Sequence, residues 1–160
     1  GKSTVGRRLA RRLGMPFADS DDEIETAARR SIADIFETYG EESFRDGERR
    51  VIARLIEGKP KVIATGGGAF MNERTRALIL ERCIAVWLDA DVEVLAERVS
   101  RRGHRPLLKG KEALPFLRDL AALRNPVYAE AHIHVRSQQM PHDRAVQQIV
   151  KALTAHRDAA

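Results

Sequence analysis

Apolar residues along the chain alternate between helical and strand-like spacing. In residues 3–13, Val5, Leu9 and Leu13 recur every four positions, which predicts an amphipathic helix that ends at Gly14. Short apolar runs predict four strands, at 17–18, 61–65, 84–88 and 132–135. Because helical segments separate these runs, the pattern favours an α/β domain with a mostly parallel sheet.

Capping residues and apolar spacing predict the other helices. Residues 31–34 have the form of a capping box, and Gly40 is expected to break the helix that begins there before it continues over 41–56. Asn72 is expected to cap a helix that runs to Arg82. Further helices are predicted at 22–28, 92–101, 113–123, 125–131 and 143–156, with an irregular loop at 103–111.

The composition predicts a single globular domain over residues 1–160. Apolar residues make up 43% of the chain, and no apolar run approaches the length of a membrane span. The one cysteine, Cys83, permits no internal disulfide and favours a cytoplasmic location. The net charge of +5 calls for a test against nucleic-acid binding, but aromatic residues are only 5%, too few for a base-stacking surface. We therefore expect neither a nucleic acid nor a membrane as partner.

The first residues, Gly1-Lys2-Ser3-Thr4, match the second half of the phosphate-binding pattern G-x-x-x-x-G-K-[ST]. In that pattern the lysine reaches the β- and γ-phosphates, and the hydroxyl of Ser3 would ligate Mg²⁺. The alternative is an ordinary basic helix start. If the pattern is real, residues upstream of Gly1 complete the loop and supply a central strand. On this expectation, a 1–160 fragment binds ATP poorly and is unstable.

Two other motifs follow predicted strands. Asp19-Ser20-Asp21 comes after the strand at 17–18, where one carboxylate could hold a Mg²⁺ water and the other could accept a proton from a substrate hydroxyl. The alternative is an acidic turn that caps the next helix. Thr65-Gly66-Gly67-Gly68 follows the strand at 61–65, and its glycines would let backbone N–H groups approach a ligand. The alternative there is a flexible turn.

Three arginines, Arg45, Arg105 and Arg124, are further candidates because a guanidinium binds carboxylate or phosphate through two parallel hydrogen bonds. Each of them alone is more simply explained as a solvated surface residue. Neither composition nor spacing distinguishes these two interpretations.

In order and spacing, the motifs together resemble those of shikimate kinase, a P-loop enzyme of the nucleoside monophosphate kinase-like group, from Gly1 to about Ala152. The residues that carry the resemblance are 19–21, 31–36, Phe44-Arg45, 66–69, 105–108, and Arg124 with Pro126 and Tyr128. The resemblance implies a three-layer α/β/α fold with a parallel sheet of order 2-3-1-4-5, whose first strand would precede this chain. It also implies substrate-binding helices at about 22–57 and a lid at about 101–112.

By the same resemblance, the chain transfers a phosphoryl group from MgATP to the 3-hydroxyl of shikimate in aromatic amino acid biosynthesis, and we expect a monomer. Catalytic roles are implied for Asp21, Lys2 and Arg105. Substrate contacts are implied for Asp21, Arg45, Gly66, Gly67, Gly68 and Arg124. Nucleotide contacts are implied for Gly1, Lys2, Ser3, Thr4, Arg98, Arg105, Gln139 and Pro141, and Mg²⁺ contacts for Ser3 and Asp19.

Two other functions stay open at this point. One is a kinase of the same group that acts on another small metabolite, such as a gluconate-type kinase. The other is a non-catalytic homologue that binds nucleotide or a partner protein. Phe44-Arg45, the three glycines and Arg105-Pro106-Leu107-Leu108 argue against the first alternative, and the retained acidic and arginine positions argue against the second.

Overall fold

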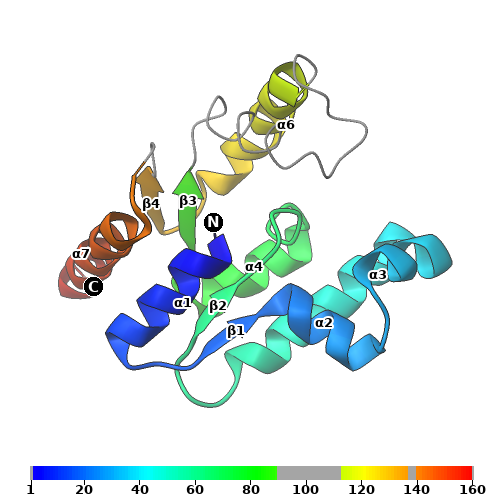
Figure 1. Cartoon of the computed structure of the whole chain (residues 1–160), viewed down its shortest axis with the longest axis horizontal. Helices are drawn as coiled ribbons and strands as arrows, with labels where there is room; N and C mark the ends of the chain where they lie inside the picture. The colour runs from blue at the N-terminus through cyan, green and yellow to red at the C-terminus, as the bar shows by residue number, and fades with distance from the viewer. Residues whose placement is uncertain (1, 90–112, 137–139, 160) are drawn as a thin grey trace. The chain divides into compact units, whose positions relative to one another are not determined.

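The computed structural model describes residues 2–89, 113–136 and 140–159, which fall into two compact units, Gly1–Ile84 and Ala85–Ala160. Figure 1 shows the elements of both units. The predicted helix at 92–101 and the predicted loop at 103–111 lie outside the described residues. The prediction of one kinase domain over 1–160 stays a prediction.

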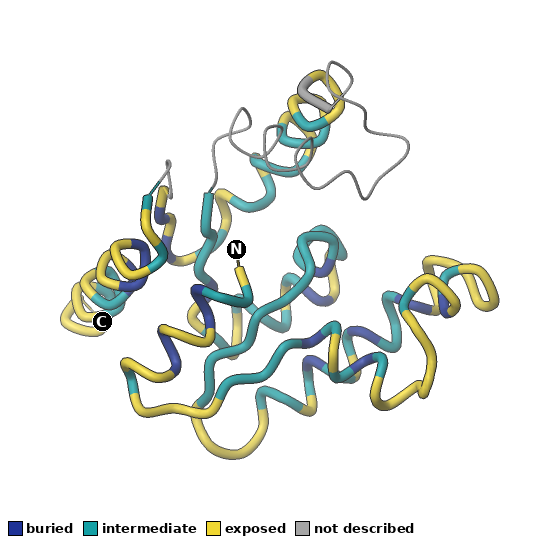
Figure 2. The backbone as a smooth tube through the Cα atoms, in the orientation of Figure 1, coloured by how far each residue is buried: buried dark blue, intermediate teal, exposed yellow. Residues whose placement is uncertain are grey.

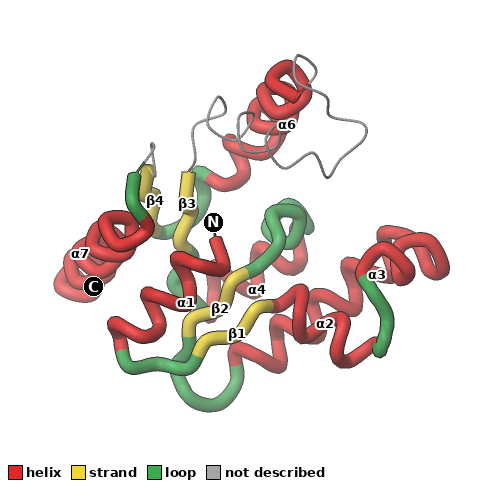
Figure 3. Tube along the Cα trace, in the orientation of Figure 1, coloured by secondary structure: helices red, strands yellow, loops and turns green. Residues whose placement is uncertain are grey.

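The first unit contains a parallel pair of strands with helices packed on it. The strands β1 (Phe17–Asp19) and β2 (Val62–Ala64) pair in register from Phe17 opposite Val62 to Asp19 opposite Ala64. Helix α1 (Lys2–Leu13) packs against β2 (Figure 3) and buries Val5, Leu9 and Ala10, the apolar face that the sequence predicts. The carboxyl ends of both strands therefore lie at one edge, where a parallel α/β sheet binds its ligands.

Helices α2 (Ser20–Ala28) and α3 (Ile32–Ile56) form a second part of this unit, with a small apolar core of their own. Ile24, Ile35 and Phe44 are buried in it, and Figure 2 shows the buried segments along these helices. The expected break in α3 is confirmed as a kink at Gly40, whose φ of 83° is a left-handed value that favours glycine. The kink lets both halves of α3 contribute to the same core.

Helix α4 (Glu73–Arg82) follows β2 after a series of turns. Its predicted cap is confirmed, because Asn72 Oδ1 accepts hydrogen bonds from the backbone N–H groups of Arg74 and Thr75, both at 3.1 Å. The turns that begin at Gly66 therefore end at a fixed point, the start of α4.

The second unit contains another parallel pair, β3 (Val86–Asp89) and β4 (Ile133–Arg136). Helix α7 (His142–Ala159) packs its buried Ala145, Val146 and Ile149 against β4. The described residues thus hold two separate two-stranded parallel sheets, β1–β2 and β3–β4. If β1 is counted as the second strand of the expected order 2-3-1-4-5, the pairs β1–β2 and β3–β4 correspond to its neighbours 2-3 and 4-5.

One predicted boundary in this unit is wrong. Two helices were predicted, at 113–123 and 125–131, but the structure has one helix, α6 (Ala113–Tyr128), with Pro126 inside it. Pro126 lies in the last turn, so its missing N–H removes one hydrogen bond near the end of the helix. The backbone closes immediately afterwards with a bond from Ala129 N–H to the Asn125 carbonyl at 2.9 Å.

Candidate active site

The first half of the candidate site joins the start of α1 to the end of β1. The Ser3 hydroxyl donates a hydrogen bond to Asp19 Oδ2 at 2.7 Å. The other oxygen of the same carboxylate, Oδ1, accepts from the backbone N–H groups of Asp21 at 2.9 Å and Asp22 at 3.3 Å. Asp19 therefore does cap the following helix, as the alternative interpretation had it, and its second oxygen remains directed at Ser3.

Asp21, in the first turn of α2, lies beside the glycine-rich turn that follows β2. A β-carbon on Gly66 would lie 3.3 Å from both carboxylate oxygens of Asp21. Burial raises the pKa of the Asp21 carboxyl, and three neighbouring carboxylates raise it further: Asp19, Asp22 and Glu25. The positive charge of Arg45 acts on this pKa in the opposite direction. The result is a carboxylate that is a stronger base than a solvated aspartate.

Arg45 reaches the same turn from α3. A β-carbon on Gly68 would collide with Nη2 of Arg45 and would lie 2.9 Å from its Cζ, so any side chain there would displace the guanidinium from this position. The guanidinium carbon also lies 5.1 Å from the ring centroid of Phe44 and 5.9 Å from that of Phe36. Arg45 is thereby held next to the glycine backbone on a rigid aromatic support.

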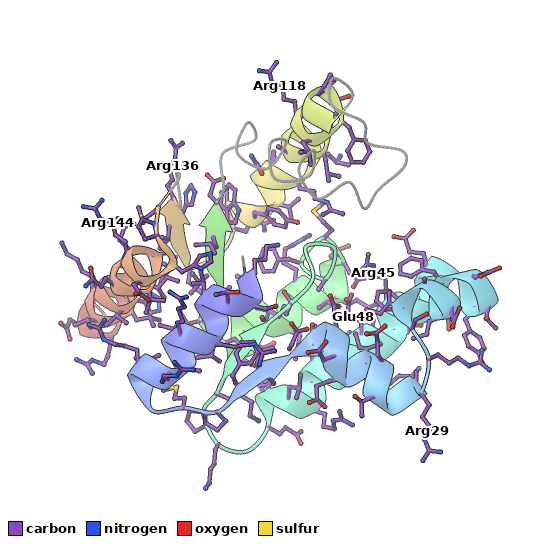
Figure 4. All side chains as sticks on the ribbon, in the orientation of Figure 1. Arg29, Arg45, Glu48, Arg118, Arg136 and Arg144 are labelled. Atoms are coloured by element: carbon purple, nitrogen blue, oxygen red, sulfur yellow. The ribbon has the colours of Figure 1, made fainter. Side chains whose placement is uncertain are left out.

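Glu48 is a site residue that the sequence analysis missed. Its carboxylate accepts a hydrogen bond from Arg45 Nη1 at 2.8 Å and is 1% exposed; Figure 4 labels both residues on α3. Burial raises the pKa of Glu48, and the hydrogen bond from Arg45 opposes that increase. A signal was present: Phe44, Glu48 and Ile52 recur every four residues on the buried face of the helix, so an acid occupies a core position.

Comparisons with known proteins identify the family of this chain. The family model for shikimate kinase matches residues 1–154. The chain belongs to the shikimate kinase family. A shikimate kinase of Caulobacter vibrioides is 59% identical over 153 residues, which are 96% of this chain and 76% of that protein. One of Zymomonas mobilis is 56% identical, over 96% of this chain and 87% of the relative.

Solved structures give the same family and the P-loop kinase fold. A shikimate kinase from Acinetobacter baumannii, solved in complex with shikimate, is 40% identical with a TM-score of 0.86, over 97% of this chain and 87% of that one. The enzyme from Aquifex aeolicus is 37% identical with a TM-score of 0.85, over 98% and 92%. This family member therefore has the predicted α/β fold.

The structure brings some of the predicted site residues of this shikimate kinase family member together. Those in the first unit are Ser3, Asp19, Asp21, Arg45 and the glycine turn, and Lys2 and Thr4 belong to the first turn of α1. Arg124 lies half-buried on α6 and Pro141 lies exposed before α7, both in the second unit. Their place at the same site stays a prediction. The predicted residues Gly1, Arg98, Arg105 and Gln139 lie outside the described residues.

The Ser3–Asp19 pair offers a hydroxyl and a carboxylate oxygen side by side, which are the hard oxygen ligands that Mg²⁺ prefers. Within residues 2–89, 113–136 and 140–159, no three His, Cys, Asp or Glu side chains gather closely enough to hold a metal ion. Mg²⁺ is usually bound by one or two protein groups together with substrate phosphates and water.

Glu48 should make the stability of this family member depend on pH. Because its folded-state pKa lies above the ordinary value of 4.5, the stability that it contributes is complete below that value and is lost as the pH rises through the folded-state pKa. Glutamine at this position does not titrate. The advantage of the natural protein over Glu48→Gln in free energy of unfolding should therefore shrink as the pH rises above 4.5.

Urea unfolding of both proteins at a series of pH values measures this difference. The exposed Glu42 on the same helix provides the control variant, Glu42→Gln, for which we expect no comparable change with pH. A difference between the natural protein and Glu48→Gln that grows as the pH rises contradicts the expectation.

Proposed function

We propose that this chain catalyses the transfer of a phosphoryl group from ATP to the 3-hydroxyl of shikimate, giving shikimate 3-phosphate and ADP. Membership of the shikimate kinase family and the similarity to a relative solved with shikimate support this function. The observation that carries it is that Asp21 and Arg45 reach one glycine turn from two different helices. A basic carboxylate and a carboxylate-binding guanidinium thus stand beside the same stretch of backbone.

In the proposed reaction, Asp21 orients the 3-hydroxyl of shikimate or takes its proton. Its raised pKa suits that role, because a carboxylate with greater proton affinity is a better general base. Arg45 and Arg124 bind the substrate carboxylate, for which a guanidinium offers two parallel hydrogen bonds. Residues 66–68 contact the substrate through their backbone, which a substrate can approach closely because glycine has no side chain of its own.

The nucleotide end of the proposed site is at the start of α1. There Gly1, Lys2 and Thr4 contact the phosphates, which the positive end of the helix dipole favours. Ser3 and Asp19 hold Mg²⁺, which when bound neutralises charge on the phosphates. Arg105 adds charge from the proposed lid, while Arg98, Gln139 and Pro141 lie at the adenine.

An assay of ADP release by the natural gene product that contains this chain tests the proposal. Shikimate, gluconate and no acceptor are compared at equal ATP and Mg²⁺ concentrations. We expect ADP release to depend on shikimate. ADP release that depends on gluconate supports the gluconate-type alternative. If no ADP is released with either acceptor, the result supports the non-catalytic homologue. Omission of Mg²⁺ should abolish the shikimate-dependent rate.

The oligomeric state, the location in the cell and the macromolecular partners are also part of this proposal. None of the helices among the described residues is long and apolar enough to cross a membrane. We propose a monomer that acts in the cytoplasm without a nucleic-acid or membrane partner. Size-exclusion chromatography with light scattering tests the first of these points, and a band shift that weakens with salt would contradict the absence of nucleic-acid binding.

Gly68→Ala is expected to lower kcat/KM for shikimate by about 100-fold, because the new methyl group pushes the Arg45 guanidinium away from its binding position. Gly47→Ala on α3 is the matched control, since no atom lies within 4 Å of the position that its β-carbon would take. The control should retain activity and be as stable as the natural protein or slightly more so. If the two variants have equal kinetics, the close contact between Gly68 and Arg45 does not contribute to substrate binding.

A further inference from the structure

The first turn of α4 contains an arginine, Arg76, whose charge the helix dipole does not stabilise. Arg76 is the fourth residue of α4, close to the end where the helix dipole is positive and where acidic residues such as Glu73 are favoured. Its side chain is half-buried, so solvent screens the unfavourable interaction only in part. A guanidinium at such a position needs partners outside its own helix.

Arg76 finds such partners in the turns that precede α4. Its Nη1 donates to the carbonyl of Phe70 at 3.2 Å and more weakly to that of Met71 at 3.4 Å. Both residues are half-buried. The side chain thereby connects α4 to the backbone that leads away from the three glycines.

Turn bonds also hold the backbone between Gly66 and Asn72. Ala69 N–H donates to the Gly66 carbonyl and Met71 N–H to the Gly68 carbonyl, both at 3.2 Å. Asn72 N–H donates to the Ala69 carbonyl at 3.3 Å. Three consecutive glycines lose much conformational entropy on folding, so further contacts to this segment help to define its conformation.

The glycine end of this segment forms part of the candidate site. Gly66 lies against the Asp21 carboxylate and Gly68 against the Arg45 guanidinium. We propose that Arg76 is a positioning residue, which holds the glycine turn against Asp21 and Arg45 by fixing the Phe70 and Met71 carbonyls to α4. The positioning of the turn by Arg76 is inferred from these contacts, whereas an effect of Arg76 on shikimate binding rests on the proposed function.

Arg76→Met removes every donor of the side chain and keeps its aliphatic length. Arg74→Met is the matched control, because Arg74 is an exposed arginine in the same helical turn and its loss changes the helix charge equally. We expect hydrogen exchange of the Ala69, Met71 and Asn72 amides to accelerate at least tenfold in Arg76→Met and to be unchanged in Arg74→Met. Exchange of the β1 and β2 amides should stay the same in both.

The kinetic readout uses the natural gene product. Arg76→Met should raise the KM for shikimate about tenfold, with a smaller change in kcat and none in the KM for ATP. Arg76→Lys, which retains a charged donor, should recover part of that loss. If both arginine variants show the same exchange and the same kinetics, or if Arg76→Met loses stability throughout without a local change in the turn, the proposal is wrong.

The two proposals fail separately. If the natural protein does not phosphorylate shikimate but exchange in the turn still depends on Arg76, the proposed function is wrong and the positioning of the turn stands. If shikimate is phosphorylated and neither exchange nor the KM responds to Arg76→Met, the positioning role is overturned and the proposed function stands.

Discussion

Asp21→Asn is expected to lower kcat with shikimate by about 10²- to 10⁴-fold, the range that a positioned general base contributes. Asparagine has the same shape as aspartate, so the contact with Gly66 is retained, but its amide cannot accept the hydroxyl proton at neutral pH. Shikimate binding should persist, since Arg45 and the glycine backbone are untouched. Initial rates measure the first effect, and titration calorimetry with shikimate measures the second.

Asp22→Asn controls for the loss of negative charge at this helix start. Asp22 is an exposed neighbour whose charge also acts on Asp21, but its side chain lies outside the contact with Gly66. We expect this variant to retain most of its activity. An unchanged kcat in Asp21→Asn removes Asp21 from its role, and an equal loss in both variants shows that local charge, rather than proton transfer, matters.

The features of the fold that depend on local interactions could be predicted from local sequence patterns. The apolar spacing of α1, the Asn72 cap and the glycine break in α3 depend on residues within one or two turns, and all three are confirmed. Helix α2 begins at Ser20, two residues earlier than predicted, because Asp19 is its cap. Pro126 was treated as a helix boundary, although a proline so near a helix end removes only one bond.

The sequence named some residues of the candidate site but none of their contacts. The family resemblance proposed Asp21 and Arg45, yet their meeting at Gly66 and Gly68 depends on how α2, α3 and β2 pack. No spacing rule relates positions so far apart in the chain. Glu48 was missed for another reason: an acid in an amphipathic helix reads as a solvated residue unless its register with Phe44 and Ile52 is examined.

Arg45→Gln is expected to raise the KM for shikimate by about 100-fold, because it removes the two charge-assisted hydrogen bonds proposed for the substrate carboxylate. The KM of Arg45→Lys should lie between those of the natural protein and Arg45→Gln, because a lysine supplies the charge without the planar pair of donors. Arg49→Gln, one turn further along α3, is the control: its partner is Asp46 at 3.1 Å, and the pair is partly exposed. Its KM should be unchanged.

Arg45→Gln should also destabilise the protein, because it leaves the Glu48 carboxylate buried without its charged partner at a cost of about 3 kcal/mol. The double variant, Arg45→Gln with Glu48→Gln, removes both charges and should recover most of that stability in urea unfolding. Its KM for shikimate should nevertheless stay about 100-fold raised. Recovery of both stability and KM would mean that Arg45 supports the fold and does not bind the substrate, whereas recovery of stability alone separates the two roles.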